Sequence, residues 1–350
     1  MKKGIIFIAI ISTFFSCEKM FIGEDAVNNP EENFELFWND FDQHYSLFQI
    51  RGWDWDSVYA AHRPMINMQT TEQELFDTFK SMVAYLDDSH TFVARVHNNF
   101  NRDLDFYASG SEDDKQVEKE FSVDLVKEKY LENLKDIPHE EEESQYFYGN
   151  IKDQDIGYLY LSNIGLEDHD FMDDVLKDIG SNKAMILDIR SNGGGEDVLA
   201  QAIAGRFADK RKLVYTVQDR NGPKHSDFSE KREYYTEVKG KEHYDKPLIV
   251  LTDKITVSAA EILLLHLRAF DKVTFMGTET SGDFSDTSMR RFLPNGFQYQ
   301  YSIMQFLLPD GSSLDGIGHI PDIYIRNSEV NILAGNDKVM EKAIEFISGL

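Results

Sequence analysis

Apolar residues at helical spacing dominate the front part of the chain. From residue 31 they recur every three or four positions, which predicts a helix with one apolar face. A second helix is expected over 55–62, and the capping sequence Thr-Glu-Gln-Glu at 71–74 predicts the start of a third. We therefore expect an N-terminal helical domain over 31–96. The apolar face of the first helix is formed by Phe34, Phe37, Trp38, Phe41 and Tyr45.

The pattern changes from residue 151 onward, where apolar runs of strand length alternate with amphipathic helical stretches. This alternation predicts an α/β core over 151–350, built on a largely parallel sheet with helices on its faces. In sheets of this kind, reactive groups collect at the carboxyl ends of the strands. The expected strands are 157–161, 184–189 and 248–252, and the expected helices are 171–179, 198–207 and 259–270.

Between these two parts lies an acidic stretch, 97–150, which we interpret as a variable insert. A helical pattern runs over 121–134, and the acidic run 140–143 is typical of a solvated loop. The sequence of the insert has no glycine-rich carboxylate-binding loop, so no PDZ domain is evident.

The first residues are typical of a bacterial lipoprotein signal. Two lysines precede an apolar run over 5–15 that is too short to span a bilayer as a helix. The run leads to Ser16 and Cys17, and a single cysteine excludes an intramolecular disulfide. We predict a signal peptide over 1–16, lipidation of Cys17 and a flexible tether over 17–30, so that the protein is anchored to a bacterial membrane outside the cytoplasm. The alternative is an ordinary signal peptide with an incidental cysteine.

The formal net charge of −26 argues against nucleic acids as partners. Nucleic-acid binding draws on clustered lysine and arginine, so long-range repulsion argues against DNA or RNA. The sequence contains neither the His-Glu-x-x-His spacing of a zinc site nor an EF-hand loop. We therefore expect no metal and no other cofactor.

Ser258 is the first candidate for a reactive group. It follows the expected strand 248–252 after a short loop and stands at the start of the next helix. A helix N-terminus offers unpaired N–H groups to a developing oxyanion, and the amide of Ala259 is the obvious donor. The alternative is structural, because Ser258 and Glu261 also have the spacing of a capping box.

A second loop with three consecutive glycines, 193–195, follows the buried strand 184–189. Consecutive glycines allow backbone N–H groups to face a substrate closely. A phosphate site is disfavoured, because the loop matches no phosphate-binding pattern and is followed by Glu196 and Asp197. An oxyanion or peptide-backbone site fits the loop better.

A serine nucleophile needs a base, and His90 is the most suggestive of the ten histidines. It ends the sequence Leu-Asp-Asp-Ser-His at 86–90, between the third helix and an apolar strand. His319, in the loop Gly-Ile-Gly-His-Ile-Pro-Asp at 316–322, is the rival.

Five motifs follow one another along the chain. They are Leu-Asp-Asp-Ser-His at 86–90, Leu-Asp-Ile-Arg-Ser-Asn-Gly-Gly-Gly at 187–195, Val-Ser-Ala-Ala-Glu at 257–261, Gly-Thr-Glu-Thr-Ser-Gly at 277–282 and Asp-Gly-Ile-Gly-His-Ile-Pro-Asp-Ile at 315–323. In this order they resemble the tail-specific (C-terminal processing) serine peptidases, in the branch of the tricorn-core type. The helical front is also similar to the N-terminal domain of that family, which leaves only 97–150 unmatched.

The resemblance implies a crotonase/ClpP-like spiral α/β core with Ser258 as nucleophile. In the processing-protease branch a lysine follows Gly-x-Thr-x-Gly, and here Asp283 stands in its place. A carboxylate cannot act as a neutral lysine, so a Ser-Lys dyad is disfavoured, and Lys254 matches no position of the family. In the tricorn-like branch the base is the histidine of a Ser-His pair, oriented by a distant acid. The implied site residues are the catalytic Ser258, His90, Ser89 and Asp315, the oxyanion donors Gly194, Ala259 and Gly193, and the substrate-binding Thr280 and Gly282.

We therefore interpret the protein as a serine endopeptidase that hydrolyses extended or unfolded polypeptides through an acyl-enzyme on Ser258. One alternative is a catalytically inactive ligand- or peptide-binding lipoprotein on the same fold. Another is a scaffold lipoprotein in which Ser258 only caps its helix. The enzyme requires Ser258 and His90 to converge, whereas a binding protein requires a large apolar cavity.

Overall fold

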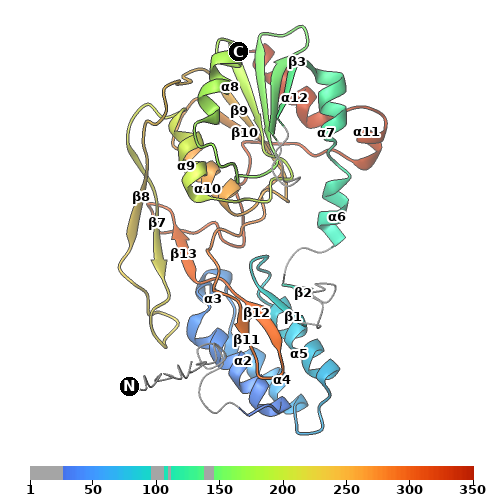
Figure 1. Ribbon diagram of the computed structural model, residues 1–350, viewed down its shortest axis with the longest axis vertical. Coiled ribbons are helices and arrows are strands. Elements are labelled where there is room, and N and C mark those ends of the chain that lie inside the picture. Colours follow the sequence, from blue (N-terminus) through green and yellow to red (C-terminus); the bar gives the residue numbers. More distant parts are fainter. Residues whose placement is uncertain (1–26, 96–105, 109–111, 138–145) are drawn as a thin grey trace, which may run out of the picture.

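The computed structural model describes residues 27–95, 106–108, 112–137 and 146–350, and these form a helical lobe and an α/β lobe (Figure 1). The expected signal peptide, Cys17 and the acidic run 140–143 lie outside the described residues. None of the helices in the described ranges combines the length and the apolar character needed to cross a membrane.

The helical lobe begins where the sequence places a capped helix. The Asn29 side chain accepts the N–H of Glu32, and Pro30 occupies the first helical turn. The predicted capping box at Thr71 and Glu74 opens the third long helix. The elements are α2 (Pro30–His44), α3 (Phe48–Arg51), α4 (Trp55–His62) with the 3₁₀ turn η1 (Arg63–Met65), α5 (Glu72–Ala84), and an antiparallel sheet in the order β11 (Arg291–Phe292), β12 (Phe297–Gln300), β1 (Phe92–Arg95) and β2 (Phe106–Tyr107).

The aromatic stripe of α2 forms the core of this lobe, as its periodicity predicts. Phe37 and Phe41 are fully buried, and their rings lie 5.1 and 5.8 Å from the ring of Tyr299 on β12. A segment from the expected α/β core therefore completes the helical lobe. The expected boundary between the helical domain and the core therefore does not separate the sheets, because β11 and β12 come from the expected core but belong to the helical lobe.

The α/β lobe is built on a seven-stranded sheet in the order β14-β10-β9-β6-β5-β4-β3. Its five strands from β14 to β5 are parallel, which confirms the predicted parallel sheet, whereas β4 and β3 pair antiparallel at one edge. The strands are β3 (Leu131–Ile137), β4 (Tyr146–Ile151), β5 (Ile156–Leu161), β6 (Ala184–Asp188), β9 (Leu248–Thr252), β10 (Val273–Gly277) and β14 (Ile323–Tyr324).

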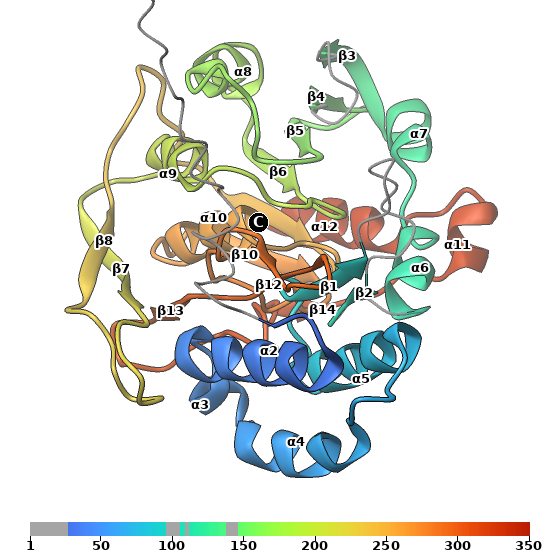
Figure 2. The same ribbon diagram turned by 60° about the horizontal axis from the view of Figure 1, so that its bottom comes forward.

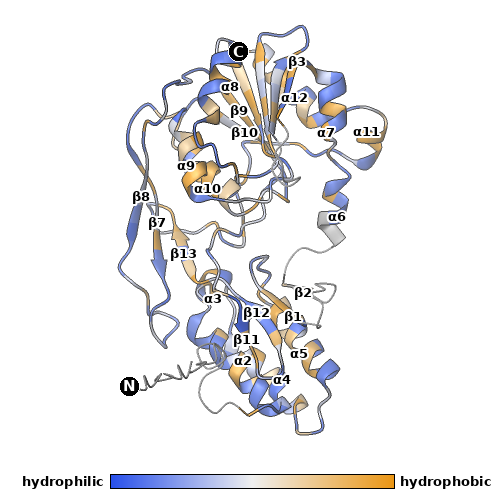
Figure 3. Cartoon of the chain, viewed as in Figure 1, coloured by the Kyte–Doolittle hydropathy of each residue, from blue (hydrophilic) through white to orange (hydrophobic). Residues whose placement is uncertain are grey.

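Helices cover both faces of this sheet, so its central strands are apolar on both sides (Figures 2 and 3). In β9, Leu248 and Val250 pack with α8, α9 and α10, while Ile249 and Leu251 pack with α12. Alternate side chains of the strand thus pack into two separate hydrophobic cores, one on each face of the sheet. The helices are α8 (Phe171–Ile179), α9 (Asp197–Gly205), α10 (Ala259–Leu267) and α12 (Lys338–Ser348).

The pattern at 121–134 predicts a helix, and this prediction is wrong in its second half. The chain forms the short helix α7 (Val123–Leu125) and the π-helical turn η2 (Val126–Tyr130), and then enters β3. Strand β3 pairs with β4, so partners far along the chain override the local helical pattern. The expected insert therefore contributes two strands to the main sheet. The remaining elements are α6 (Glu112–Glu118), α11 (Glu329–Leu333), and the three-stranded sheet of β13 (Met304–Leu307), β7 (Lys212–Asp219) and β8 (Arg232–Thr236).

Candidate active site

Three loops meet at the carboxyl ends of β6, β9 and β10, where the parallel sheet predicts a site. The Val257 N–H donates to Asn192 O at 3.1 Å, and the Ser281 N–H donates to Thr256 O at 3.0 Å. The buried carboxylate of Asp253 accepts the N–H of Ser191 at 2.9 Å. These bonds hold the loops of all three strands in one fixed arrangement.

Ser258 occupies a strained backbone position at the start of α10. Its φ is +60° and its ψ is −127°, a region that non-glycine residues rarely adopt and that costs about 1–3 kcal/mol. A sharp strand-to-helix turn of this kind pushes a serine hydroxyl outward. The side chain is half-buried, and Ser258 stands at the N-cap position of α10.

The glycine loop packs directly against this serine. An added Cβ at Gly194 would lie 2.7 Å from the Cβ of Ser258 and 3.1 Å from the N atom of Ala259. The φ of Gly194 is +88°, so a glycine is required both for space and for conformation. The predicted neighbours Gly194, Ser258 and Ala259 are therefore brought together.

The amides of these neighbours differ in their availability. The Gly194 N–H donates to Asn192 Oδ1 at 2.9 Å, so it is engaged in the loop. Ala259 is the first residue of α10, and its N–H has no acceptor within the helix. Gly193 has open space around its Cα, with no atom within 4 Å of an added Cβ. Among the described residues, the N–H groups of Ala259 and Gly193 are therefore the candidates to meet an oxyanion beside Ser258.

Glu261 connects the Ser258 loop to the loop after β10. Its buried Oε2 accepts the N–H of Ser258 at 3.3 Å and that of Asp283 at 2.9 Å. Its Oε1 accepts the Thr280 hydroxyl at 2.5 Å and the Gly282 N–H at 2.8 Å. Burial raises the pKa of Glu261 to about 7, and these donors oppose the rise.

Asp283 in turn connects that loop to the Ser-His pair of the helical lobe. Its Oδ2 accepts the Ser89 hydroxyl at 2.7 Å, and its Oδ1 accepts the Ser89 N–H at 3.3 Å. The guanidinium of Arg51 in α3 lies 2.5 Å from Oδ1, and both side chains of this ion pair are almost fully buried. The predicted residues Ser89 and Ser258 are thereby linked through Asp283 and Glu261.

His90 lies half-buried beside Ser89, in the turn that precedes β1. Its N–H donates to Asp88 Oδ1 at 3.0 Å, and its buried ring atom Nδ1 has no hydrogen-bond partner among the described residues. Burial raises the pKa of Asp286, and the nearby His90 opposes that rise. Within the described ranges no hydrogen bond joins His90 to Ser258, so the expected convergence of the two side chains is not made by a direct bond.

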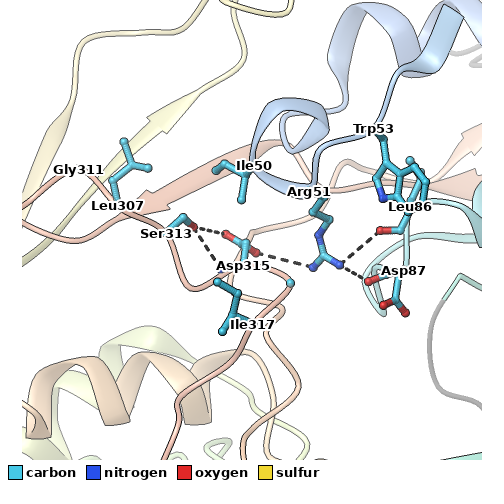
Figure 4. Close-up of a pocket in the computed structure, with 11 residues that line it drawn as sticks. Ile50, Arg51, Trp53, Leu86, Asp87, Leu307, Gly311, Ser313, Asp315 and Ile317 are labelled. Carbon is cyan, nitrogen blue, oxygen red and sulfur yellow. Dashed lines mark hydrogen bonds and ion pairs between the residues drawn. The ribbon is translucent and has the colours of Figure 1, made fainter. Parts of the chain in front are cut away.

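Asp315, the predicted acid, lies close to this network but contacts other groups. Its Oδ1 accepts the Phe284 N–H at 3.2 Å, its Oδ2 accepts the Ser313 hydroxyl at 3.3 Å, and Arg51 Nη2 lies 4.0 Å away. Figure 4 shows Arg51 reaching from Asp315 to the carbonyls after α5. Burial raises the pKa of Asp315 to about 8, so the group is protonated at neutral pH.

The other candidates for a base are occupied elsewhere. His319 accepts from Arg268 Nε at its Nδ1 and contacts the Glu261 carbonyl at its Nε2, both at 2.9 Å. Burial lowers the pKa of His319 to about 3, with a further contribution from Arg268. Lys254 donates to the carbonyls of Thr280 and Ser281 at 3.1 Å. Both residues therefore support the loops.

The residues expected to bind substrate are turned inward. Thr280 is fully buried, and its hydroxyl donates to Glu261. The Gly282 carbonyl accepts from Arg51 Nη2 at 3.0 Å and from the Gly316 N–H at 2.7 Å. Their polar atoms are thus engaged in shaping the loop.

Beside Arg51 and Asp315 lies a cavity of about 350 Å³ between the two lobes (Figure 4). It combines apolar side chains with carboxyl and hydroxyl groups, and Asp87 lies at its edge with a φ of +48°. Sequence reasoning missed Arg51, because an arginine in a short amphipathic helix carries no motif. The sequence indicates Glu261 only as part of a capping box, and Asp283 only as the residue at the position of the family's lysine.

Comparison with known proteins finds family matches in both lobes. Residues 155–325 match the model described as Peptidase family S41, and residues 26–84 match that described as Tricorn protease C1 domain. The carboxy-terminal processing protease CtpA of Bacillus subtilis is 26% identical over 50% of this chain, and the carboxy-terminal-processing protease of Bartonella bacilliformis is 30% identical over 49%. The chain spans only 36% and 39% of the length of these curated relatives.

A solved structure covers far more of the chain. The crystal structure of a putative peptidase from Parabacteroides merdae superposes with a TM-score of 0.77 and 26% sequence identity. The match covers 92% of this chain and 97% of that one, so the helical lobe and the α/β lobe are both included.

Proposed function

The chain is a member of peptidase family S41, and we propose that it is an extracytoplasmic serine endopeptidase that cleaves extended or unfolded polypeptides. The observation that carries the proposal is the strained backbone conformation of Ser258, which packs against Gly194 at the N-terminus of α10. A buried chain of hydrogen bonds through Glu261 and Asp283 joins Ser258 to the Ser89–His90 segment. The leader and Cys17 would anchor the protein to a bacterial membrane, with its polypeptide substrates outside the cytoplasm.

The proposed reaction needs no cofactor. The Ser258 Oγ attacks the carbonyl carbon of the scissile bond while His90 takes its proton, and the oxyanion receives the N–H groups of Ala259 and Gly193. His90 then gives the proton to the leaving amine, which completes the acyl-enzyme. Water attacks the ester with His90 again as base, and the acid product leaves Ser258 free.

The test is hydrolysis of an unfolded protein, casein, by the purified chain lacking residues 1–17. Ser258→Ala and His90→Ala variants with unchanged circular dichroism are measured beside the parent. We expect cleavage by the parent and its loss in both variants. Equal cleavage by all three would exclude Ser258 and His90, and no cleavage by any, at substrate concentrations where the casein binds, would favour the peptide-binding alternative.

A further inference from the structure

The acid that supports the Ser-His pair can be identified from its contacts. Four carboxyl groups lie near the pair: Asp88 accepts the His90 N–H, Asp286 interacts electrostatically with His90, and Asp283 and Asp315 lie close to the guanidinium of Arg51. Among the described residues, the Ser89 hydroxyl and N–H donate to Asp283. We propose that Asp283, held by Arg51, is the acid that positions Ser89 and His90 for Ser258. This inference rests on the proposed peptidase function and identifies a positioning residue within the same site.

The first argument is the set of donors that Asp283 receives. Both polar hydrogens of Ser89 point to this carboxylate, the hydroxyl at 2.7 Å and the N–H at 3.3 Å. The Ser281 hydroxyl adds a bond of 2.5 Å. Since the hydroxyl proton of Ser89 is donated to Asp283, its oxygen can only accept further bonds, which is the role needed to orient a protonated imidazole nitrogen.

The second argument is the charge of the group. Asp283 receives only donors, and an ionised carboxylate is an acceptor at both oxygens. Arg51 lies 2.5 Å away in a buried pair, with 4% of its side chain exposed against 2% for Asp283. A buried charge is retained when it is paired and hydrogen-bonded, and both conditions hold here.

The third argument is position. The backbone N–H of Asp283 donates to Glu261 Oε2, the same oxygen that accepts the N–H of Ser258. One residue is therefore attached by its backbone to the nucleophile helix and by its side chain to the residue that precedes the base. The separation of Ser258 from His90 is thus set through Asp283.

Asp315 does not have these properties. In the described part of the chain its bonds go to Phe284 and Ser313, and none goes to Ser89 or His90. Its burial beside other carboxylates raises its pKa to about 8. A protonated group near Arg51 fills space and supports the loop.

The experiment compares Asp283→Asn, Ser89→Ala, the double variant and Asp315→Asn in the full-length chain, with fluorescein-labelled casein as substrate. Asp283→Asn is expected to lower kcat roughly tenfold to hundredfold with little change in KM. Loss of the negative charge also moves the acid limb of the kcat/KM profile to lower pH, which a purely structural defect would not do. The activity of the double variant should be no lower than that of the less active single variant, because the two residues act as one unit.

The matched control is Asp173→Asn, which disrupts the buried pair of Arg206 and Asp173 away from the site. It should lower the melting temperature while kcat stays unchanged. Since Asp283→Asn can fail to fold, Ser89→Thr and Ser89→Ala test the same contact with the ion pair intact. We expect Thr to keep most of the activity and Ala to lose it.

Several outcomes would overturn the inference. These are a larger loss from Asp315→Asn than from Asp283→Asn, additive losses in the double variant, or full activity of Ser89→Ala. In each of them Ser258→Ala remains inactive, so the peptidase function stands and only the role of Asp283 fails. If Ser258→Ala cleaves casein like the parent, the proposed function fails first and the inference with it.

Discussion

The carboxylate of Glu261 turns back to the backbone N–H of Ser258, with 3.3 Å between Oε2 and N. This is half of the arrangement that a Ser-x-x-Glu capping box predicts. In the other half, the Glu261 N–H that meets the Ser258 side chain also donates to the Ser258 carbonyl oxygen, at 2.7 Å. The structural and the catalytic interpretations of this motif are compatible: the glutamate holds the helix end, and a hydroxyl that accepts an N–H still has its own proton to give to a base.

Glu261→Gln should lower both stability and activity. The amide group would place a donor against the N–H groups of Ser258, Gly282 or Asp283, and the acceptor that is charged above a pKa of about 7 is lost. Breaking hydrogen bonds to a buried charged group costs about 1.5–3 kcal/mol. We expect a lower melting temperature and slower labelling of Ser258 by a fluorophosphonate probe. The control is Glu74→Gln, which alters the exposed capping box at Thr71 and should change neither by much. Similar effects of both substitutions would contradict the bridging role of Glu261.

Substitutions of the two candidate histidines, His90 and His319, should differ in their effects on stability and activity. His90→Ala removes a half-buried ring whose Nδ1 has no hydrogen-bond partner in the described part of the chain, so it should cost little stability while abolishing casein hydrolysis. His319→Ala removes the contacts to Arg268 and to the Glu261 carbonyl, and it leaves a cavity in the core. We expect its melting temperature to fall by several degrees. Thermal unfolding and casein hydrolysis measured on both variants check the assignment, and an active, folded His90→Ala would make it wrong.

Gly194→Ala should block the site. The new Cβ would lie 2.7 Å from the Cβ of Ser258 and 2.8 Å from the Val257 carbonyl oxygen, in a backbone with a φ of +88°. We expect a loss of fluorophosphonate labelling and a less stable protein, because neither the backbone nor Ser258 can move freely. Gly193→Ala is the control for folding, since it meets no atom within 4 Å and should leave the melting temperature close to that of the parent. Equal labelling of Gly194→Ala and the parent would exclude the close packing.

Much of this site could be predicted because its signals are local. Strand, turn and helix around Ser258 follow from an apolar run, a short loop and a capping pair, and the three glycines at 193–195 identify their own loop. Parallel strands then bring these loops to one edge, so Ser258 and Gly194 converge as expected. The same holds for α5, whose capping box at Thr71 is readable from four residues.

What could not be predicted depends on contacts between distant segments. Arg51 reaches Asp283 across 232 positions of the chain, and no periodicity encodes such a pair. The sheet of the helical lobe takes Tyr299 from the far end of the chain, and β3 replaces a helical pattern because β4 pairs with it. The partner of Ser89 was similarly hidden, since motif position alone makes Asp315 the acid while the hydrogen bonds lead to Asp283.

Asp315 should make the protein less stable as the pH rises. Its pKa is raised by burial to about 8 in the folded chain, against about 3.9 when unfolded. Between these values the unfolded state has lost a proton that the folded state keeps, so the free energy of unfolding falls by at most about 1.4 kcal/mol for each pH unit. Asp315→Asn lacks this proton, and its stability relative to the parent should therefore increase from pH 5 to pH 8.

The measurement is urea unfolding of the parent and of Asp315→Asn at several pH values from 5 to 8. Asp173→Asn serves as the control of opposite sign. The pKa of Asp173 is lowered although burial opposes the shift, because Arg206 and two backbone N–H groups stabilise the carboxylate. Its contribution is fully present above the unfolded pKa and is lost only as the pH falls through the lower folded value, so the deficit of Asp173→Asn should stay constant over this window. A constant difference for Asp315→Asn as well would mean that Asp315 is ionised in the folded protein and that Arg51 offsets the cost of its burial.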